Sequence, residues 1–315
     1  MRTATLLAAC LVPAALVLTP LLAHAGQVHV NVANFAFTPR AANINPGDHV
    51  VWVWTSGLHT VTSGDSATTT PSGVFDSGQQ TGAAPNGGPA FSWKADRTGT
   101  ILYYCLIHAP GMAGRVIVAT SPGSVPVSDF RVTEVQFTGT AATDMIEIAN
   151  LGTAPGDLGR YRIAVNGVAT AIGADDYAVP AGGRVVVHTT SGTNTATDIF
   201  LPGLGDLPAA ASLALYVPNT VPGTTLTDAT QMIDFVQWGA GGGALEGVAV
   251  TDGFWSAGQS VNNVATGHSI EFCGASGQYG RAEWAEIAVP NFGSNGNCTT
   301  PAQTRTWGQV KTLYR

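Results

Sequence analysis

Charged residues are scarce in this 315-residue chain, in which Asp, Glu, Lys and Arg together occupy 10% of the positions. The only lysines are Lys94 and Lys311, and the formal net charge is −7. A protein that neutralises a phosphate backbone needs a cluster of basic side chains, and the sequence contains no such cluster. Nucleic acid is therefore not expected as a partner.

Long apolar runs are also missing after the N-terminus, so no membrane span is expected there. Residues 1–25 combine a basic start, an apolar stretch over residues 4–22 and a small-x-small cleavage sequence that ends at Ala25. This pattern is typical of a cleaved secretory signal peptide. A lipoprotein signal ending at Cys10 is the alternative, but it leaves most of the apolar run unused. We expect an exported protein, periplasmic or extracellular.

Helical periodicity is the third absence. The chain has 39 glycines and 18 prolines among stretches rich in Val, Thr, Ser and Ala, a composition typical of short strands joined by tight turns. We predict an all-β fold, and we expect residues 61–90 to be mostly loop, interrupted near residues 73–78. The predicted organisation is a signal peptide over 1–25, a first β-sandwich over 26–120, a linker over 121–127, a second β-sandwich over 128–298 and a polar tail over 299–315.

Cysteine is rare, and its count is informative. Removal of the signal peptide leaves Cys105, Cys273 and Cys298, an odd number in an oxidising compartment. Cys273 and Cys298 lie in one C-terminal region and are predicted to pair, which would stabilise the fold by about 3–4 kcal/mol. Cys105 is then a lone thiol in an exported protein, and such a thiol needs an explanation.

The segment LYYCLIHAPGMAGRVI, residues 102–117, places Cys105, His108 and Met112 in a short loop between two strand-like runs. A thiolate and an imidazole supply two thirds of a trigonal metal site, and a thioether can cap it from a longer distance. Sulfur ligands combined with imidazole select copper. A second imidazole is required, and His59, which follows the strand-like run HVVWVW, is the natural candidate.

Three segments together resemble a known family. GLHTVTSGD at 57–65, GVFDSG at 73–78 and YYCLIHAPGMAG at 103–114 are similar to segments of cupredoxins of the plastocyanin and azurin type. The resemblance extends over residues 27–119. It implies a Greek-key β-sandwich that binds one type 1 copper ion through His59, Cys105, His108 and Met112. Gly111 and Gly114 would then allow the tight loop and the return into the last strand.

Two details depart from the best-known members of that family. Three residues separate His108 from Met112, a gap between the shorter and longer loops of the family. Thr60 stands where plastocyanins usually have Asn, in a neighbourhood that hydrogen-bonds the thiolate in the family. Both departures bear on the reduction potential rather than on copper binding.

Other interpretations of the motif remain open. Cys105 could be an inert buried thiol, or part of a structural zinc site in which Met112 would be a poor fourth ligand. A catalytic cysteine would need an orienting group and an oxyanion hole. No His-x-His motif occurs, which argues against an oxidase with several copper ions. The remaining histidines of the mature chain are expected to be structural or exposed: His29, His49, His188 and His268.

The second half of the chain resembles a lamin tail domain, an immunoglobulin-like β-sandwich, from about residue 128 to 240. Segments that carry the resemblance are FRVTEVQFTG, MIEIAN, GRVVVHT and DFVQWG. It implies a module for attachment or interaction. A metal site or an acid–base pair is the alternative for its carboxylates, but we expect Glu147 to point outward from a strand, and Asp157 and Asp234 to cap backbone amides at turns or strand edges. The carboxylates in question are Glu134, Asp144, Glu147, Asp157 and Asp234.

We therefore expect an exported one-electron carrier, not an enzyme, with His108 as the electron exit. The small apolar residues Ala109, Pro110 and Gly111 would form the docking patch for a redox partner protein, and a cell-surface or protein partner is possible for the second sandwich. The alternative is a surface, adhesion or copper-binding protein in which copper is structural, sensed or scavenged.

Overall fold

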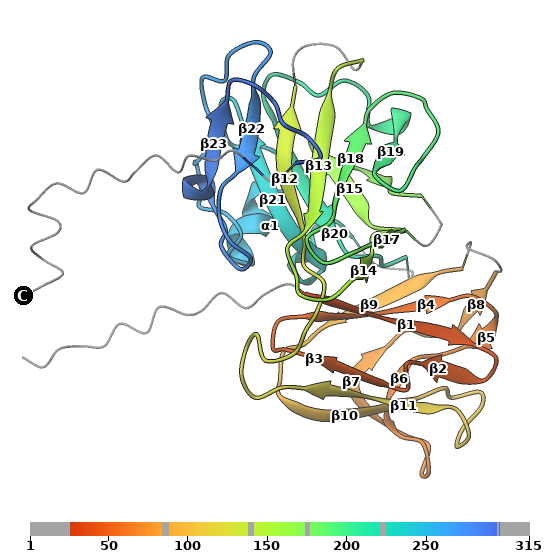
Figure 1. Ribbon diagram of the computed structural model, residues 1–315. Coiled ribbons are helices and arrows are strands. Elements are labelled where there is room, and N and C mark those ends of the chain that lie inside the picture. The colour runs from red at the N-terminus through yellow and green to blue at the C-terminus, as the bar shows by residue number, and fades with distance from the viewer. Residues whose placement is uncertain are drawn as a thin grey trace, which may run out of the picture.

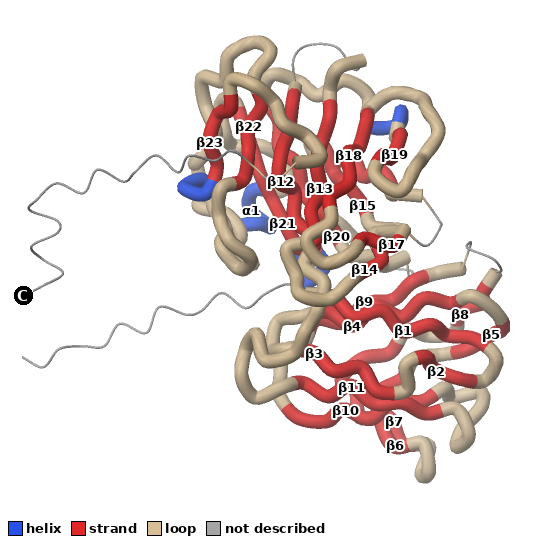
Figure 2. Tube along the Cα trace, in the orientation of Figure 1, coloured by secondary structure: helices blue, strands red, loops and turns tan. Residues whose placement is uncertain are grey.

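The computed structural model describes residues 26–83, 88–137, 142–173, 177–220, 225–294 and 296. The predicted signal peptide, the predicted tail and Cys298 lie outside these described residues. In the described part the chain forms two groups of β-strands, with one short helix, α1 (Glu246–Thr251), beside the second group (Figure 2). The expectation of an all-β protein with two sandwiches is confirmed. Three single-turn 3-10 helices complete the elements: η1 (Pro202–Leu204), η2 (Ala229–Gln231) and η3 (Arg281–Glu283).

The first sandwich packs two sheets face to face. One sheet has the order β2-β1-β4-β9 and consists of β1 (Gln27–Ala33), β2 (Ala36–Thr38), β4 (His49–Trp54) and β9 (Ala90–Lys94). The other has the order β3-β11-β10-β6-β7 and consists of β3 (Ala41–Ile44), β6 (Thr62–Asp65), β7 (Thr70–Asp76), β10 (Gly99–Tyr104) and β11 (Ala113–Val118). A small separate pair is formed by β5 (Gly57–His59) and β8 (Gln80–Gly82).

The second sandwich also has two main sheets. The larger has the order β19-β18-β13-β12-β22-β23 and consists of β12 (Phe130–Gln136), β13 (Met145–Asn150), β18 (Arg184–His188), β19 (Asp198–Phe200), β22 (Ser269–Phe272) and β23 (Trp284–Ile287). The other has the order β16-β15-β20-β21 and consists of β15 (Arg162–Val165), β16 (Val168–Ala171), β20 (Ala211–Tyr216) and β21 (Met232–Trp238). A two-stranded pair is formed by β14 (Gly156–Asp157) and β17 (Ala178–Val179).

Strand β4 explains how the two sandwiches meet. Successive side chains of a strand point to opposite faces of the sheet, and every residue of β4 is buried. Trp52 and Trp54 enter the core of the first sandwich. Val51 and Val53 point the other way and join the core of the second sandwich, together with Ala90 of β9. One face of this sheet is therefore covered by the second sandwich, which lies above it in Figure 1.

Polar contacts complete the interface between the sandwiches. The His49 Nε2 atom lies 2.6 Å from the carbonyl oxygen of Thr230. Ser92 donates to Gln231 over 2.7 Å, and Lys94 forms an ion pair with Asp252 at 2.6 Å. These contacts come from strands β4 and β9 and lie beside the buried valines. The two sandwiches are thus packed against each other rather than connected by the linker alone.

The expectation of mostly loop over residues 61–90 is wrong. Strands β6, β7 and β8 occupy much of this segment. Most residues of β7 are exposed, and β7 is the edge strand of its sheet. An exposed edge strand tolerates the Ser, Thr, Gly and Pro residues that made the segment look like a loop.

The three carboxylates with a predicted orientation lie as expected, but two of them, Glu147 and Asp234, are buried. Glu147 points to the outer face of its sheet but is buried, because the segment around Gly293 covers that face and its backbone N–H donates to Glu147 over 2.7 Å. Asp234, in the edge strand β21, accepts from the backbone N–H groups of Val132 and Phe235 over 2.8 and 2.9 Å and also forms an ion pair with Arg131 at 3.0 Å. Asp157 does cap a turn, accepting from the backbone N–H groups of Gly159 and Tyr177.

Within the described residues, no helix has the length and apolar character needed to cross a bilayer.

Candidate metal centre

The loop between β10 and β11 is closed by its own backbone hydrogen bonds. The Cys105 N–H donates to the Met112 carbonyl over 3.0 Å, and the Met112 N–H donates to the His108 carbonyl over 3.1 Å. The His108 N–H donates back to the Cys105 carbonyl over 3.2 Å. Because these bonds link each of the three residues to another, their relative backbone positions are set by the loop itself.

His59 reaches the same place from the end of β5. Its carbonyl oxygen accepts from the indole N–H of the buried Trp54 over 3.2 Å. Gly57 has a φ of +74°, and a Cβ atom built there would lie 2.7 Å from His59 Nε2. Glycine at this position therefore leaves room for the imidazole ring as well as for the left-handed backbone.

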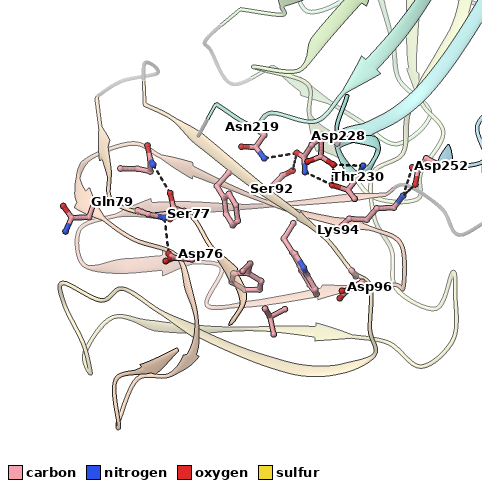
Figure 3. A pocket seen from close by; sticks show the side chains of 18 residues that line it. Asp76, Ser77, Gln79, Ser92, Lys94, Asp96, Asn219, Asp228, Thr230 and Asp252 are labelled. Atoms are coloured by element: carbon pink, nitrogen blue, oxygen red, sulfur yellow. Dashed lines mark hydrogen bonds and ion pairs between the residues drawn. The ribbon is translucent and has the colours of Figure 1, made fainter. Parts of the chain in front are cut away.

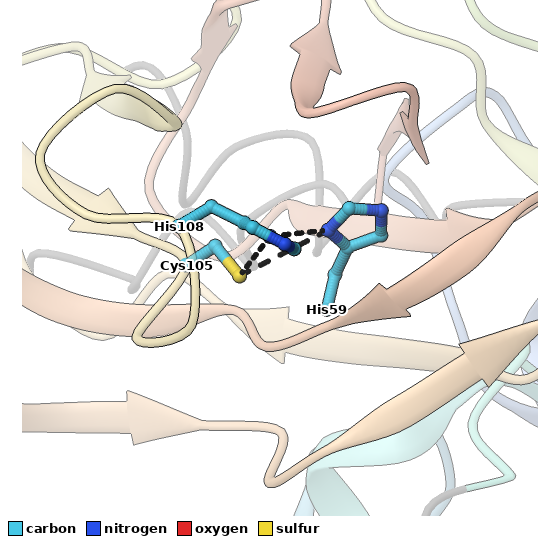
Figure 4. A group of neighbouring side chains, drawn as sticks. All are labelled: His59, Cys105 and His108. Carbon is cyan, nitrogen blue, oxygen red and sulfur yellow. Dashed lines mark hydrogen bonds between the residues drawn. The ribbon is translucent and has the colours of Figure 1, made fainter.

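Three donor atoms from these two segments converge (Figure 4). The Nδ1 atoms of His59 and His108 lie 3.1 Å apart. Cys105 Sγ lies 3.9 Å from His59 Nδ1 and 3.4 Å from His108 Nδ1. In the described part of the chain, this is the single group of three or more His, Cys, Asp or Glu side chains with metal-binding geometry.

The size of this triangle suits a metal ion. The three edge lengths define a point in the plane of the triangle that lies about 2 Å from all three atoms. This distance is close to the usual length of a metal–imidazole bond and slightly shorter than a metal–thiolate bond. One thiolate and two imidazoles are the donors of a trigonal copper site. The residues present therefore fit a copper ion.

Burial prepares the same atoms for metal binding. Cys105 is fully buried, and His59 is 2% exposed. Burial lowers the pKa of His59 below its ordinary value of 6.5, and the nearby His108 lowers it further, while a backbone hydrogen bond at Ser56 opposes the shift. A lowered pKa favours the neutral imidazole, which is the form that binds a metal.

Thr60 connects the two segments that carry the donors. Its backbone N–H lies 3.3 Å from Cys105 Sγ and donates to it. Its hydroxyl oxygen accepts from the Leu106 N–H over 2.9 Å. The sequence marked Thr60 as a departure from the usual Asn, and the structure shows that threonine still forms a bridge between the segments at this position.

The remaining motif residues differ in how strongly the fold constrains them. Met112 is 1% exposed and belongs to the same buried cluster as Cys105. A Cβ atom at Gly114 would lie 2.5 Å from the ring of Tyr103, so this position has no space for a side chain. At Gly111 a Cβ atom would approach only the His108 carbonyl, at 3.6 Å, so space does not demand glycine there.

The other histidines lie elsewhere and contact other groups. His49 is buried between the sandwiches. His188 pairs with Asp198 at 3.0 Å, and His268 pairs with Glu286 at 2.6 Å. His29 lies 3.7 Å from Asp157 of the second sandwich. Each of these four histidines therefore has a partner outside the group of His59, Cys105 and His108.

Sequence reasoning missed Phe35. This residue lies in the turn between β1 and β2, and its ring stands edge-on to the imidazole of His108, with 4.6 Å between centroids and 89° between planes. A similar perpendicular contact joins it to His59 at 6.0 Å. The preceding Asn34 is a turn signal, but nothing in the local pattern reveals that the turn reaches the metal centre.

A separate groove of about 1060 Å³ runs between the two sandwiches (Figure 3). Phe75, Phe91 and Trp93 line its side on the first sandwich, and Asp228 and Asp252 line the other side. Its polar groups are largely engaged with one another: Asp252 pairs with Lys94, and Asp228 accepts from the Thr230 N–H and hydroxyl. None of the three converging metal donors lines it.

Comparison with known proteins agrees with this site. The sequence model of the copper-binding proteins of the plastocyanin/azurin family matches residues 24–119. No curated protein sequence matches the chain. Among solved structures, the chain is similar to a purple cupredoxin from Nitrosopumilus maritimus, with 23% identity, 30% of this chain and 99% of that chain covered, and a TM-score of 0.25.

It is also similar to amicyanin from Paracoccus versutus, with 22% identity, 30% of this chain and 81% of that chain covered, and a TM-score of 0.24. The family match covers the whole first sandwich, including the residues whose donor atoms converge. It therefore identifies the first sandwich as a copper-binding domain of the plastocyanin/azurin family, with one copper ion as its cofactor.

Proposed function

We propose that His59, Cys105 and His108 bind the copper ion as a type 1 centre, with Met112 as the axial thioether. The observation that carries the proposal is the triangle of Nδ1, Nδ1 and Sγ atoms, with edges of 3.1, 3.4 and 3.9 Å. Met112 is buried in the same cluster as Cys105, as an axial ligand must be. This donor set favours copper over zinc because structural zinc takes four strong Cys, His or carboxylate ligands, and the thioether of Met112 is not one of them.

A copper ion bound there supplies one-electron transfer between its Cu(I) and Cu(II) states. The chain holds the donors in place by the closed loop around Cys105 and by the hydrogen bonds that join Thr60, the neighbour of His59 in the sequence, to Cys105 and Leu106. Because these backbone contacts do not depend on the metal, the ligand positions need to change little between oxidation states. This protein is therefore proposed as an electron carrier rather than a catalyst.

The surface next to His108 is suited to a redox partner protein. His108 is only half-buried, and three exposed apolar side chains lie next to proposed ligands in the sequence: Leu58 at 44%, Leu106 at 44% and Ile107 at 40% exposure. The predicted patch of Ala109, Pro110 and Gly111 continues this surface along the loop. Exposed apolar groups of this kind are typical of protein docking sites.

The second sandwich is proposed to position the carrier, in line with its resemblance to lamin tail domains. Its packing on β4 and β9 supports positioning more than loose tethering. Export to the periplasm or beyond, cleavage after Ala25 and the Cys273–Cys298 disulfide remain predictions from the sequence. A protein that senses or scavenges copper, or uses it structurally at a surface, is the second candidate, and the large second sandwich is the observation that favours it.

The first test is the visible absorption spectrum of the mature protein after addition of Cu(II). We expect an intense thiolate-to-copper band that is lost in Cys105→Ser and retained in the matched control Cys273→Ser. Reversible reduction by a partner protein would then separate the carrier from the second candidate. A wild-type protein without the band would contradict the proposed type 1 centre.

A further inference from the structure

Phe35 is conspicuous because its large apolar ring is 67% exposed while touching the metal centre. Its ring is perpendicular to the imidazoles of both His108 and His59, at 4.6 and 6.0 Å between centroids. It belongs to neither buried core cluster. The packing of the sandwich therefore does not account for an aromatic residue at this position.

The backbone of the turn makes this residue more unusual. Ala33 pairs with Ala36, which leaves Asn34 and Phe35 as a two-residue turn. Both have positive φ, 51° and 60°. Two-residue hairpin turns with positive φ at both positions prefer Asn followed by Gly. Phe35 thus occupies the place of a glycine, at a cost in backbone strain.

A side chain that is disfavoured both by its backbone and by its exposure needs a compensating role, and the contact with His108 supplies one. Perpendicular aromatic rings attract each other, because the edge of one ring faces the electron-rich face of the other. A ring in this position also restricts rotation of the imidazole. It covers part of a side chain that is otherwise open to solvent.

We propose that Phe35 is a positioning and shielding residue, which holds the His108 ring in orientation and restricts the access of small anions to the copper ion past that ring. The consequence for copper rests on the proposed function, whereas the contact between Phe35 and His108 does not require the metal. The two can therefore be tested separately.

The first experiment uses the copper-free protein and the variant Phe35→Gly, with diethyl pyrocarbonate as the probe of imidazole access. The tryptic peptide of residues 98–115 contains His108 as its sole histidine, so its acylation rate can be followed by mass spectrometry. We expect the rate at His108 to rise severalfold, with the rate at His268 unchanged. Thermal stability should be equal or higher, because Asn-Gly suits the turn.

Two further variants make the result specific. Phe35→Tyr keeps a ring in place and should restore the wild-type rate at His108. Val168→Ala trims an apolar residue of the second sandwich that is 70% exposed, and it should change nothing. An unchanged rate at His108 in Phe35→Gly, or an equal rise at His268, would overturn the proposal.

The second experiment adds azide to the Cu(II) proteins and follows the visible spectrum. We expect a spectral change in Phe35→Gly and none, or a much weaker one, in the wild type. If the wild type binds no copper, the proposed function is wrong. The acylation result still tests whether Phe35 covers and positions the His108 ring. If both copper proteins respond to azide equally, the shielding role is wrong.

Discussion

At the scale of single residues, Thr60 contributes to the metal centre through both its backbone and its side chain. It is 1% exposed, its backbone donates to Cys105 Sγ, and its hydroxyl oxygen accepts from Leu106. A hydrogen bond to a metal-bound sulfur tunes the electronic properties of the site, while the hydroxyl contact holds the two segments together. Both effects originate from one residue but can be separated by mutation.

Thr60→Val keeps the shape of the side chain and removes the acceptor of the Leu106 N–H. We expect the free energy of unfolding to fall by about 1 kcal/mol, because the partly buried Leu106 N–H loses its acceptor. Urea unfolding of the copper-free protein measures the change. Thr60→Ser retains the hydroxyl and is the control; a loss of equal size in both variants would assign the effect to packing instead.

Much of this site could be predicted from the sequence, because the Cys105 loop and the His59 segment each carry a local pattern. The resemblance also placed Thr60 in the neighbourhood that hydrogen-bonds the thiolate, but the contact of its hydroxyl with Leu106 and the position of Phe35 could not be predicted. They depend on which atoms of distant segments meet, and the local sequence around Phe35 contains only the turn signal of Asn34. Contacts of this kind arise from the tertiary fold and leave no periodic trace in the chain.

At the scale of elements, the pairing of β10 with β11 carries the ligand loop. Tyr103 lies opposite Gly114 in this pair, and the Tyr103 ring fills the space where a side chain at Gly114 would project. Burial raises the pKa of the Tyr103 hydroxyl to about 12, while its contact with Trp52 opposes the shift. The strand pair therefore depends on glycine at one position and on a neutral tyrosine at the other.

Gly114→Ala should reduce stability by about 1–3 kcal/mol, because the added methyl group overlaps a buried ring. Chemical denaturation of the variant checks this value, and the copper spectrum reports whether the loop has shifted. Gly247→Ala is a suitable control. It lies in α1 with open space around it, and alanine there should be neutral or stabilising by up to about 1 kcal/mol. A neutral result for Gly114→Ala would show that the strand pair relaxes easily.

Strands were predictable to different degrees for a physical reason. β4 carries apolar residues on both faces because it is covered by a core on each side, so its sequence stands out. β7 lies at a sheet edge with most residues exposed, and its Ser, Thr and Pro residues imitate a loop. A buried strand such as β4 has a clear pattern of apolar residues in the sequence, whereas an exposed edge strand such as β7 has almost none.

At the scale of the whole molecule, His49 makes the stability of the folded protein depend on pH. It is buried at the interface of the sandwiches, where burial first and the charge of Lys94 second lower its pKa from 6.5 to about 3, against the opposing hydrogen bond to Thr230. In the unfolded chain the imidazole has its ordinary pKa. As pH falls below 6.5, the unfolded state takes up the proton first, so stability is lost.

We expect the copper-free wild type to lose up to about 1.4 kcal/mol per pH unit through this group between pH 6.5 and 3. His49→Gln retains a donor for the Thr230 carbonyl but does not titrate in this range. The difference between the two proteins in denaturation curves measured from pH 7 to pH 4 isolates the contribution. Parallel pH dependences would mean that His49 is solvated or protonated in the folded protein.

The packing of the second sandwich on β4 and β9 has a geometric consequence. It holds the first sandwich against the second in one orientation, independently of the predicted linker over residues 121–127 (Figure 1). An electron carrier built in this way has its copper site in a fixed orientation relative to the second sandwich. If the second sandwich is attached to a surface, the copper site keeps one orientation relative to that surface. Its distance from the surface is then set by the dimensions of the two sandwiches. Lengthening the linker would then add no reach.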